Sequence, residues 1–281
     1  DGGDIAFQER SMGTMVDVTE SVFPARVNAK VAMRFTTNTG GTAWYVCSGT
    51  MIDAETVLIA AHCVYNRDAN IMDWADEVFV FPGWDGNGNY LPGSPAAGIF
   101  NHYGYGRGTS YMAGTNYLTS GDLDADMATI RVTRAVGSLT GWFSYAWGGD
   151  CGPIQDLFYY NFSFPSEGCG TPGLHTGTDM KYWDGTIDSC PGNRLQIDTT
   201  PGCYTAVWGG MSGSSMYYIS GGNRYAHAVC STSNRSTVGR YCKMWETYKD
   251  GLVTFIDDSR TSTFDLQALD CNFAPGSIPA G

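Results

Sequence analysis

Three side chains in this sequence stand in settings that favour nucleophilic catalysis. His62 follows the apolar run Val57–Ala61, Asp126 directly precedes the alternating run Met127–Val132, and Ser212 lies in a glycine-rich segment. Any one of them alone is weak evidence, because a histidine after an apolar run is more often a packed core residue. Together, in the order His, Asp, Ser, they predict a hydroxyl activated by an imidazole that a carboxylate orients.

The carboxylate and the base must meet for this chemistry to work. An aspartate at the start of a strand can reach the second ring nitrogen of His62, fix its tautomer and stabilise the imidazolium. Asp122 and Asp124 lie nearby, but only Asp126 immediately precedes the apolar strand, so we expect Asp126 to be the partner.

Glycines surround the candidate nucleophile in the run Gly209-Gly210-Met211-Ser212-Gly213. They permit a tight turn with unusual backbone angles, which would expose the Ser212 hydroxyl. Such a turn would also point the N–H groups of Gly210 and Ser212 into one pocket. We expect those two donors to form an oxyanion hole, an arrangement commonly worth a few kcal/mol of transition-state stabilisation.

The elements that must position these residues read as short strands. The sequence has 37 glycines, 14% aromatic and only 16% charged residues in 281, a profile typical of many strands joined by turns. A helix is expected at Glu246–Ile256 and a shorter one at Phe264–Asp270, and residues 83–120 read as a large surface insertion. The predicted strands are Lys30–Phe35, Ala43–Cys47, Thr56–Ala60, Glu77–Phe81, Met127–Val132, Leu157–Phe164 and Arg224–Cys230.

Nine cysteines, none in a Cys-x-x-Cys pair, predict disulfides and an oxidising compartment rather than a zinc site. Cys47 and Cys63 flank the segment that carries His62, and their bond would hold the general base in place. Pairing sequence neighbours further predicts Cys151–Cys169, Cys190–Cys203 and Cys230–Cys242, and leaves Cys271 over, either free or displacing one of these partners.

The formal net charge of −12 argues against nucleic acid as a partner, because a polyanion would be repelled. No run of 18 apolar residues is present, so no membrane span is expected. The first residues do not read as a signal peptide, and we expect a secreted form from which any export signal has been removed.

The blocks Cys47-Ser48-Gly49-Thr50 and Ala60-Ala61-His62-Cys63 resemble those of the chymotrypsin-like serine peptidases. Within that group the sequence is most similar to the glutamyl endopeptidase (V8-like) branch. Further elements carry that likeness: Gly210–Ser215, Gly141–Tyr145, Phe162–Pro165, and His227 placed 15 residues after Ser212.

The resemblance implies an all-β fold of two six-stranded antiparallel barrels with a C-terminal helix and the site between them. The expected divisions are an N-terminal arm at 1–12, a first barrel at 13–135 with His62 and Asp126, a second barrel with the helix at 136–258 holding Ser212, and a tail at 259–281. It implies no metal or organic cofactor.

Specificity follows from three further positions. In the glutamyl branch a histidine matching His227 helps to bind a glutamate side chain, together with a Ser or Thr five residues before the nucleophile. Here that position is Val207, which cannot hydrogen-bond a carboxylate, and Ala206 offers no charge for a basic side chain. A Glu or Asp preference and a small or apolar preference both remain open.

The sequence thus predicts a secreted, monomeric serine endopeptidase that acts on proteins or peptides through an acyl-enzyme. Two alternatives remain. One is a catalytically silent relative that serves as a binding module. The other is a hydrolase of esters or cell-wall amides that uses the same three residues.

Overall fold

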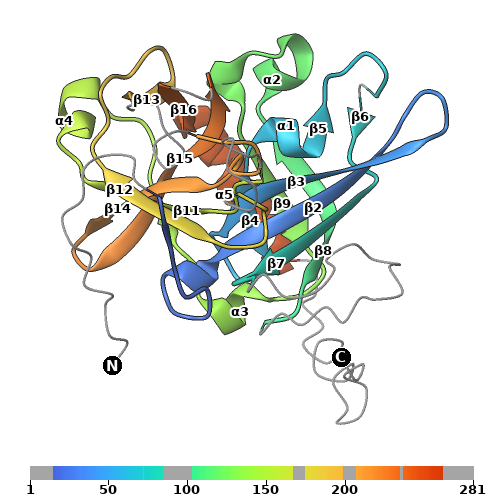
Figure 1. Ribbon diagram of the computed structural model, residues 1–281, viewed down its shortest axis with the longest axis horizontal. Helices are drawn as coiled ribbons and strands as arrows, with labels where there is room; N and C mark the ends of the chain where they lie inside the picture. The colour runs from blue at the N-terminus through green and yellow to red at the C-terminus, as the bar shows by residue number, and fades with distance from the viewer. Residues whose placement is uncertain are drawn as a thin grey trace.

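The computed structural model describes residues 15–71, 73–84, 103–166, 175–198, 207–234 and 237–261. Two β units lie side by side, as Figure 1 shows, with the blue-to-green unit formed mainly by the first half of the chain. The segments predicted as strands all contain strands, and the predicted C-terminal helix is present. The second predicted helix, Phe264–Asp270, lies outside the described residues.

The first unit is a closed barrel with strand order β2-β3-β4-β9-β8-β7. Successive side chains of a strand point to opposite faces of the sheet, and nearly all residues of β2, β4 and β7 are buried on both faces. A two-stranded ribbon of β5 (Tyr65–Asn66) and β6 (Asp73–Trp74) extends from it. The barrel strands are β2 (Asn28–Thr36), β3 (Thr42–Met51), β4 (Thr56–Ile59), β7 (Glu77–Pro82), β8 (Gly106–Ala113) and β9 (Ala128–Val132).

The expectation of a surface insertion over residues 83–120 is wrong for its second part, because β8 is a barrel strand. Its glycines are required by close packing. A Cβ on Gly106 would lie 2.7 Å from the Cβ of Val132, and one on Gly108 would lie 3.1 Å from the Cβ of Val78. The glycine content that suggests a loop here instead reflects close approach of neighbouring chain.

The second unit is one sheet with the path β1-β12-β11-β14-β15-β16-β13, and β10 pairs with β15 in parallel. Among the described residues this sheet is not a closed six-stranded barrel. Its first strand comes from the N-terminal side of the chain, where Val16 pairs with Tyr182. The strands are β1 (Val16–Asp17), β10 (Ser144–Tyr145), β11 (Tyr159–Ser163), β12 (Lys181–Gly185), β13 (Arg194–Asp198), β14 (Ser215–Ser220), β15 (Asn223–Ser233) and β16 (Val238–Lys243).

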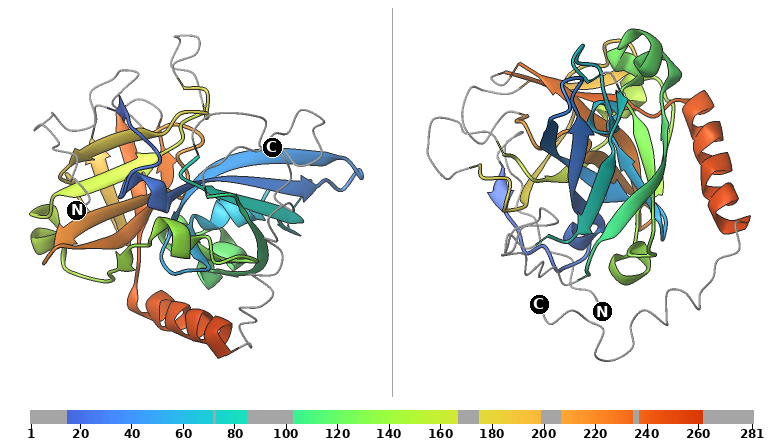
Figure 2. Two further views of the ribbon diagram at one scale, coloured as in Figure 1. Left: turned by 90° about the horizontal axis from the view of Figure 1, so that it is seen from below. Right: turned by 90° about the vertical axis from the view of Figure 1, so that its right-hand side faces the viewer.

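Helix α5 (Glu246–Thr261) follows the second sheet in sequence but packs on the first barrel. Figure 2 shows it lying along the outside of the molecule. Its buried residues Tyr248, Leu252 and Ile256 recur every four positions and form one apolar stripe. The Tyr248 hydroxyl lies 2.7 Å from the Thr129 hydroxyl of β9, so the helix is anchored on the strand that follows Asp126.

Short helical turns join the strands, and a continuous apolar core joins the two units. The main core cluster includes Val31 and Phe81 of the barrel and Phe162 and Tyr217 of the second sheet. Within the described residues no helix is both long and apolar enough to cross a membrane. The helical turns are η1 (Ala25–Val27), α1 (Ala61–Val64), α2 (Thr115–Ser120), η2 (Leu123–Ala125), α3 (Gly137–Thr140) and α4 (Cys151–Gln155).

Candidate active site

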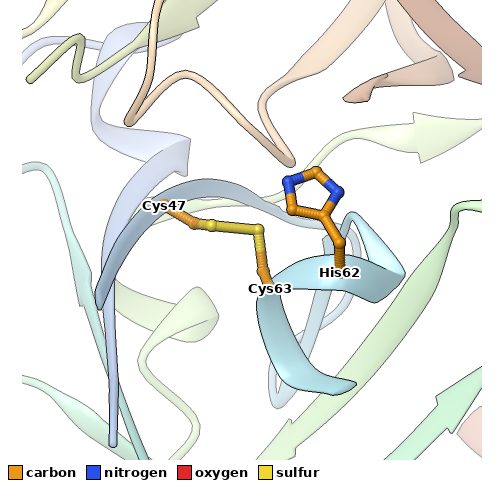
Figure 3. A group of neighbouring side chains, drawn as sticks. All are labelled: Cys47, His62 and Cys63. Carbon is orange, nitrogen blue, oxygen red and sulfur yellow. A yellow bond between two sulfur atoms is a disulfide. The ribbon is translucent and has the colours of Figure 1, made fainter. Parts of the chain in front are cut away.

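His62 lies on the single-turn helix α1, directly after barrel strand β4. Ala60 and Ala61 are fully buried, so the chain turns tightly against the barrel at this point. The predicted Cys47–Cys63 disulfide is present, with a Cα–Cα separation of 6.3 Å, and ties α1 to β3. Figure 3 shows the imidazole projecting from the same helical turn as the bonded Cys63. The covalent tie therefore fixes the residue next to the candidate base.

Asp126 meets His62 as predicted from the sequence. One carboxylate oxygen lies 2.7 Å from the Nδ1 of His62, and the other accepts the backbone N–H of His62 at 2.9 Å. The two nearby alternatives are engaged elsewhere: Asp122 accepts the backbone N–H of Asp124, and Asp124 pairs with Arg194 at 2.7 Å. The strand start at β9 thus delivers one carboxylate to both donors of His62.

Opposite charge governs the protonation of this pair. Burial alone would lower the pKa of His62, but the charge of Asp126 and the hydrogen bond to it raise the pKa above its ordinary value. Burial alone would raise the pKa of Asp126, but the His62 ring and the hydrogen bonds that the carboxylate accepts lower it. Since ionised Asp126 can only accept, Nδ1 of His62 carries the proton and Nε2 is left as a base.

Ser231 also contributes to this pair, although no sequence motif marks it. Its hydroxyl donates to Asp126 at 2.6 Å from the buried end of β15, and this bond helps to lower the pKa of the carboxyl. The only signal in the sequence is a polar residue that follows the apolar run Ala226–Cys230. Such a residue is common at strand ends, so the link needs the fold.

Ser212 lies in a turn pressed against the first barrel. Its carbonyl accepts the backbone N–H of Ser48 at 2.8 Å. Gly213, with φ of +84°, packs so closely that a Cβ would overlap the Ser48 carbonyl and lie 2.9 Å from the backbone nitrogen of Ala60. The nucleophile turn is therefore seated at the end of the strand that leads to His62. Among the described residues the Ser212 hydroxyl makes no hydrogen bond, to His62 or to any other group.

The two expected oxyanion donors are oriented by the peptide groups to which they belong. In a trans peptide the C=O and N–H point in opposite directions, so a bond that holds the carbonyl aims the N–H away from it. Within the described part of the chain, the N–H groups of Gly210 and Ser212 donate to no acceptor. The bonds that hold their peptide carbonyls run from the Ser166 N–H to the Gly209 oxygen (2.7 Å) and from the Ser214 N–H to the Met211 oxygen (2.9 Å).

Comparison with known families agrees with this arrangement. The family model described as Trypsin matches residues 20–151, the segment that holds His62 and Asp126. This segment is therefore a trypsin-family domain, and the chain is similar to the chymotrypsin-like serine peptidases. The predicted all-β fold with a C-terminal helix is thereby confirmed, with one closed barrel and one larger sheet in place of two six-stranded barrels.

Solved structures show the same fold. A Glu endopeptidase superposes with a TM-score of 0.62 at 20% identity, covering 86% of this chain and 95% of its own. The protease Anisep of Arthrobacter nicotinovorans superposes with a TM-score of 0.60 at 19% identity, covering 84% of this chain and 96% of its own. At these identities the likeness concerns the fold.

Curated relatives are similar over shorter stretches. Glutamyl endopeptidase of Bacillus licheniformis is 30% identical over 187 residues, which are 66% of this chain and 49% of that protein. A protein named extracellular metalloprotease of Bacillus subtilis is 28% identical over 141 residues, 50% of this chain and 39% of that protein. The chain thus spans half or less of the length of these two relatives.

The predicted specificity residue His227 lies in the interior. It is 3% exposed, its Nδ1 lies 2.8 Å from the Tyr159 hydroxyl and its Nε2 lies 3.1 Å from the carbonyl oxygen of Gly148. Burial lowers its pKa to about 4. The ring is therefore neutral with both nitrogens engaged, and its role in binding a substrate carboxylate stays a prediction. Spacing from Ser212 suggested that role, but the pairing of β15 turns the ring inward.

The other two predicted specificity positions are Ala206 and Val207. Ala206 lies outside the described residues. Val207 is buried and faces Gly239, where a Cβ would overlap the Val207 side chain and lie 3.1 Å from Ile197. Val207 is therefore a core residue of the second sheet.

Two of the predicted cysteine pairings are wrong in the described residues. Cys151 is bonded to Cys190, with a Cα–Cα separation of 5.7 Å, and so neither the Cys151–Cys169 nor the Cys190–Cys203 bond forms. Cys169, Cys203 and Cys271 lie outside the described residues.

Cys230 and Cys242 are free and buried, contrary to the predicted bond between them. Cys230 is paired in register with Tyr241, and Cys242 with Val229. Because paired residues share a face and neighbours along a strand alternate, the two thiols point to opposite faces of the sheet. Nearness in sequence therefore does not bring these sulfurs together.

One group of potential metal ligands occurs in the described residues, namely Cys47, His62 and Cys63. Both sulfurs belong to the disulfide seen in Figure 3 and cannot act as thiolate ligands. The imidazole alone does not make a metal site, and it already serves Asp126.

Proposed function

We propose that this chain is a secreted serine endopeptidase in which Ser212, His62 and Asp126 form the catalytic triad. The observation that carries the proposal is the bond between Asp126 and Nδ1 of His62, at 2.7 Å, beside a glycine turn that presents Ser212. That bond leaves the opposite ring nitrogen basic. The Ser212 hydroxyl makes no hydrogen bond among the described residues, and catalytic hydrogen bonds are often long or poorly aligned without substrate.

The chemistry follows from these positions. Nε2 of His62 removes the hydroxyl proton as the Ser212 oxygen attacks the peptide carbonyl, and ionised Asp126 stabilises the resulting imidazolium. The N–H groups of Gly210 and Ser212 receive the developing oxyanion. The imidazolium then protonates the departing amine, which leaves an acyl-enzyme on Ser212. Water, deprotonated by the same ring, hydrolyses that ester and restores the serine.

We propose a small or apolar side chain before the cleaved bond over Glu or Asp. Val207, five residues before Ser212, cannot hydrogen-bond a carboxylate. Both ring nitrogens of the buried His227 are already engaged by Tyr159 and Gly148. Cleavage-site profiling on a peptide library tests this preference, and a dominant Glu signal would contradict it.

Secretion and action as a monomer on protein or peptide substrates complete the proposal. Two disulfides support an oxidising compartment, because such bonds persist there. The extracellular description of the Bacillus subtilis relative supports the same location. The net charge of −12 supports peptide rather than nucleic-acid partners.

Labelling with a fluorophosphonate tests the nucleophile directly. We expect the wild-type protein to react at Ser212, and Ser212→Ala to abolish labelling and lower kcat by roughly 10⁶-fold. Ser214→Ala is the matched control, because its hydroxyl is buried and accepts a bond from Asn161 at 2.9 Å. Full activity in Ser212→Ala would assign the chemistry to another residue, and no labelling of folded wild type would indicate a silent relative.

A further inference from the structure

The Ser48 side chain links the two units at the candidate oxyanion hole. Ser48 belongs to barrel strand β3 and is fully buried. Its hydroxyl donates to the carbonyl oxygen of Gly210 at 2.8 Å and accepts the backbone N–H of Phe164 at 2.9 Å. Its own backbone N–H donates to the Ser212 carbonyl at 2.8 Å. Ser48 thus donates to the carbonyl oxygens of Gly210 and Ser212, the two residues whose N–H groups are the expected oxyanion donors.

These contacts matter because Gly210, like Gly213, has a positive φ in this turn. Its φ of +88° lies in the region that glycine adopts freely, and neighbouring peptide groups can rotate about it at little cost. The peptide group before Gly210 is held through the Gly209 carbonyl by Ser166, and the group after it is held through the Gly210 carbonyl by Ser48. With both groups held, the direction of the Gly210 N–H is fixed.

The space around Gly210 is tightly filled by neighbouring backbone. A Cβ at this position would overlap the carbonyl oxygen of Phe164 and lie 2.8 Å from the backbone nitrogen of Ser166. The Ser48 hydroxyl accepts the Phe164 N–H and so holds the residue whose carbonyl oxygen lies against Gly210. Loss of the hydroxyl would leave a buried carbonyl and a buried N–H without partners, which favours rearrangement of the turn.

We propose that the Ser48 hydroxyl is a positioning residue that keeps the Gly210 N–H aimed at the oxyanion. This inference rests on the proposed peptidase function. Ser48 touches no substrate atom. It acts through the backbone of the turn, and its effect should appear in the transition state rather than in substrate binding.

The test compares Ser48→Ala with wild type, using the best fluorogenic peptide found by cleavage profiling and a peptide aldehyde that forms a hemiacetal with the nucleophile. We expect kcat to fall about 10- to 100-fold, a part of the 10²- to 10³-fold cost of losing one oxyanion donor outright. KM should change less than about twofold. The inhibition constant of the aldehyde should rise by the same factor as kcat falls, because both report the oxyanion.

Thr129→Val is the control for loss of a buried hydroxyl. Thr129 is fully buried in the same barrel, and its hydroxyl bonds only to Tyr248 among the described residues. We expect a comparable loss of stability in this variant with kcat unchanged. Should Ser48→Ala fail to fold, Ser48→Cys, whose thiol is a weak donor of similar size, is measured in its place and should lower kcat several-fold.

Unchanged kcat and aldehyde affinity in a folded Ser48 variant would overturn the inference and leave Ser48 a purely structural residue. That result is distinct from failure of the proposed function, which is read from fluorophosphonate labelling of the wild-type protein. A rise in KM with unchanged kcat would also overturn the inference, because that pattern indicates that the variant lost binding of substrate and transition state equally.

Discussion

The neighbourhoods of His62 and His227 place the same side chain in opposite states. His62, on α1 of the first barrel, is 30% exposed and faces a buried carboxylate, and its pKa is raised. His227, on β15 of the second sheet, is 3% exposed and faces a phenol and a backbone carbonyl, and its pKa is lowered to about 4. For His62, the charge of Asp126 raises the pKa by more than burial lowers it. For His227, no negatively charged group opposes the lowering of the pKa by burial.

The two rings also carry their protons on different nitrogens. Asp126 accepts from Nδ1 of His62, so Nε2 is open to a substrate-side proton. The Gly148 carbonyl can only accept, so Nε2 of His227 carries the proton and Nδ1 accepts from Tyr159. One ring is left with a free basic site and the other with none. The comparison teaches that the groups facing both nitrogens decide what a histidine can do.

The largest effect should come from removing the charge beside His62. Asp126→Asn keeps the shape of the side chain but favours the wrong tautomer, and we expect kcat/KM to fall about 10⁴-fold at neutral pH. The pH of half-maximal activity should move down, because the carboxylate that raises the pKa of His62 is gone. Steady-state kinetics from pH 5 to 9 measure both.

Asp124→Asn is the matched control for that change. Asp124 lies two residues away and pairs with Arg194, so its loss should affect stability more than kcat. A larger kcat loss in Asp124→Asn than in Asp126→Asn would reverse the assignment of the carboxylate.

A smaller effect concerns the acid sensitivity of the His227 region. Its folded pKa of about 4 lies below the ordinary value of 6.5, so below pH 6.5 the unfolded chain binds the additional proton first. Stability is therefore lost as the pH falls from 6.5 towards 4, by on the order of 3 kcal/mol from this one group. His62 contributes with the opposite sign, since its raised pKa gives stability below pH 6.5 that is lost as the pH rises.

Urea unfolding at pH 7 and pH 4.5 isolates the His227 contribution when wild type is compared with His227→Gln. We expect the variant to be less stable at pH 7 but to lose less on acidification. If both proteins lost the same free energy of unfolding on acidification, the pKa of His227 would not be lowered in the folded protein. His227 would then not differ from His62 in the way proposed.

The smallest effect should come from Ser231. Ser231→Ala removes one of the hydrogen bonds that lower the pKa of Asp126, and loss of a bond to a charged group costs roughly 1.5–3 kcal/mol. We expect about a tenfold fall in kcat, with activity lost at a higher pH on acidification than in wild type. The control is Ser163→Ala, a buried serine of the second sheet whose hydroxyl has no partner among the described residues. A kcat within twofold of wild type for Ser231→Ala would remove Ser231 from the charge network.

The His62–Asp126 contact and the Cys47–Cys63 bond could be predicted from sequence because each depends on a short segment with a clear neighbour pattern. Asp126 was preferred because it directly precedes an apolar strand, and that strand, β9, brings it to His62. Contacts across the sheets could not be predicted in the same way.

The failures share one physical cause, which is that strand pairing decides which way a side chain faces. Spacing from Ser212 could not show that His227 turns inward, nor that Ser231 reaches Asp126. Neighbouring thiols at 230 and 242 face opposite sides of one sheet, so nearness in sequence misled the pairing. The glycine content of β8 predicts a loop, because amino-acid composition alone does not show how closely a neighbouring strand packs.

The placement of α5 makes the two halves of this chain inseparable parts. If the chain were divided between the barrel and the second sheet, the barrel fragment would expose the surface of β9 that α5 covers. The other fragment would expose the apolar residues Tyr248, Leu252 and Ile256 of the helix. The last described element of the chain thus packs on the barrel that the first half of the chain forms.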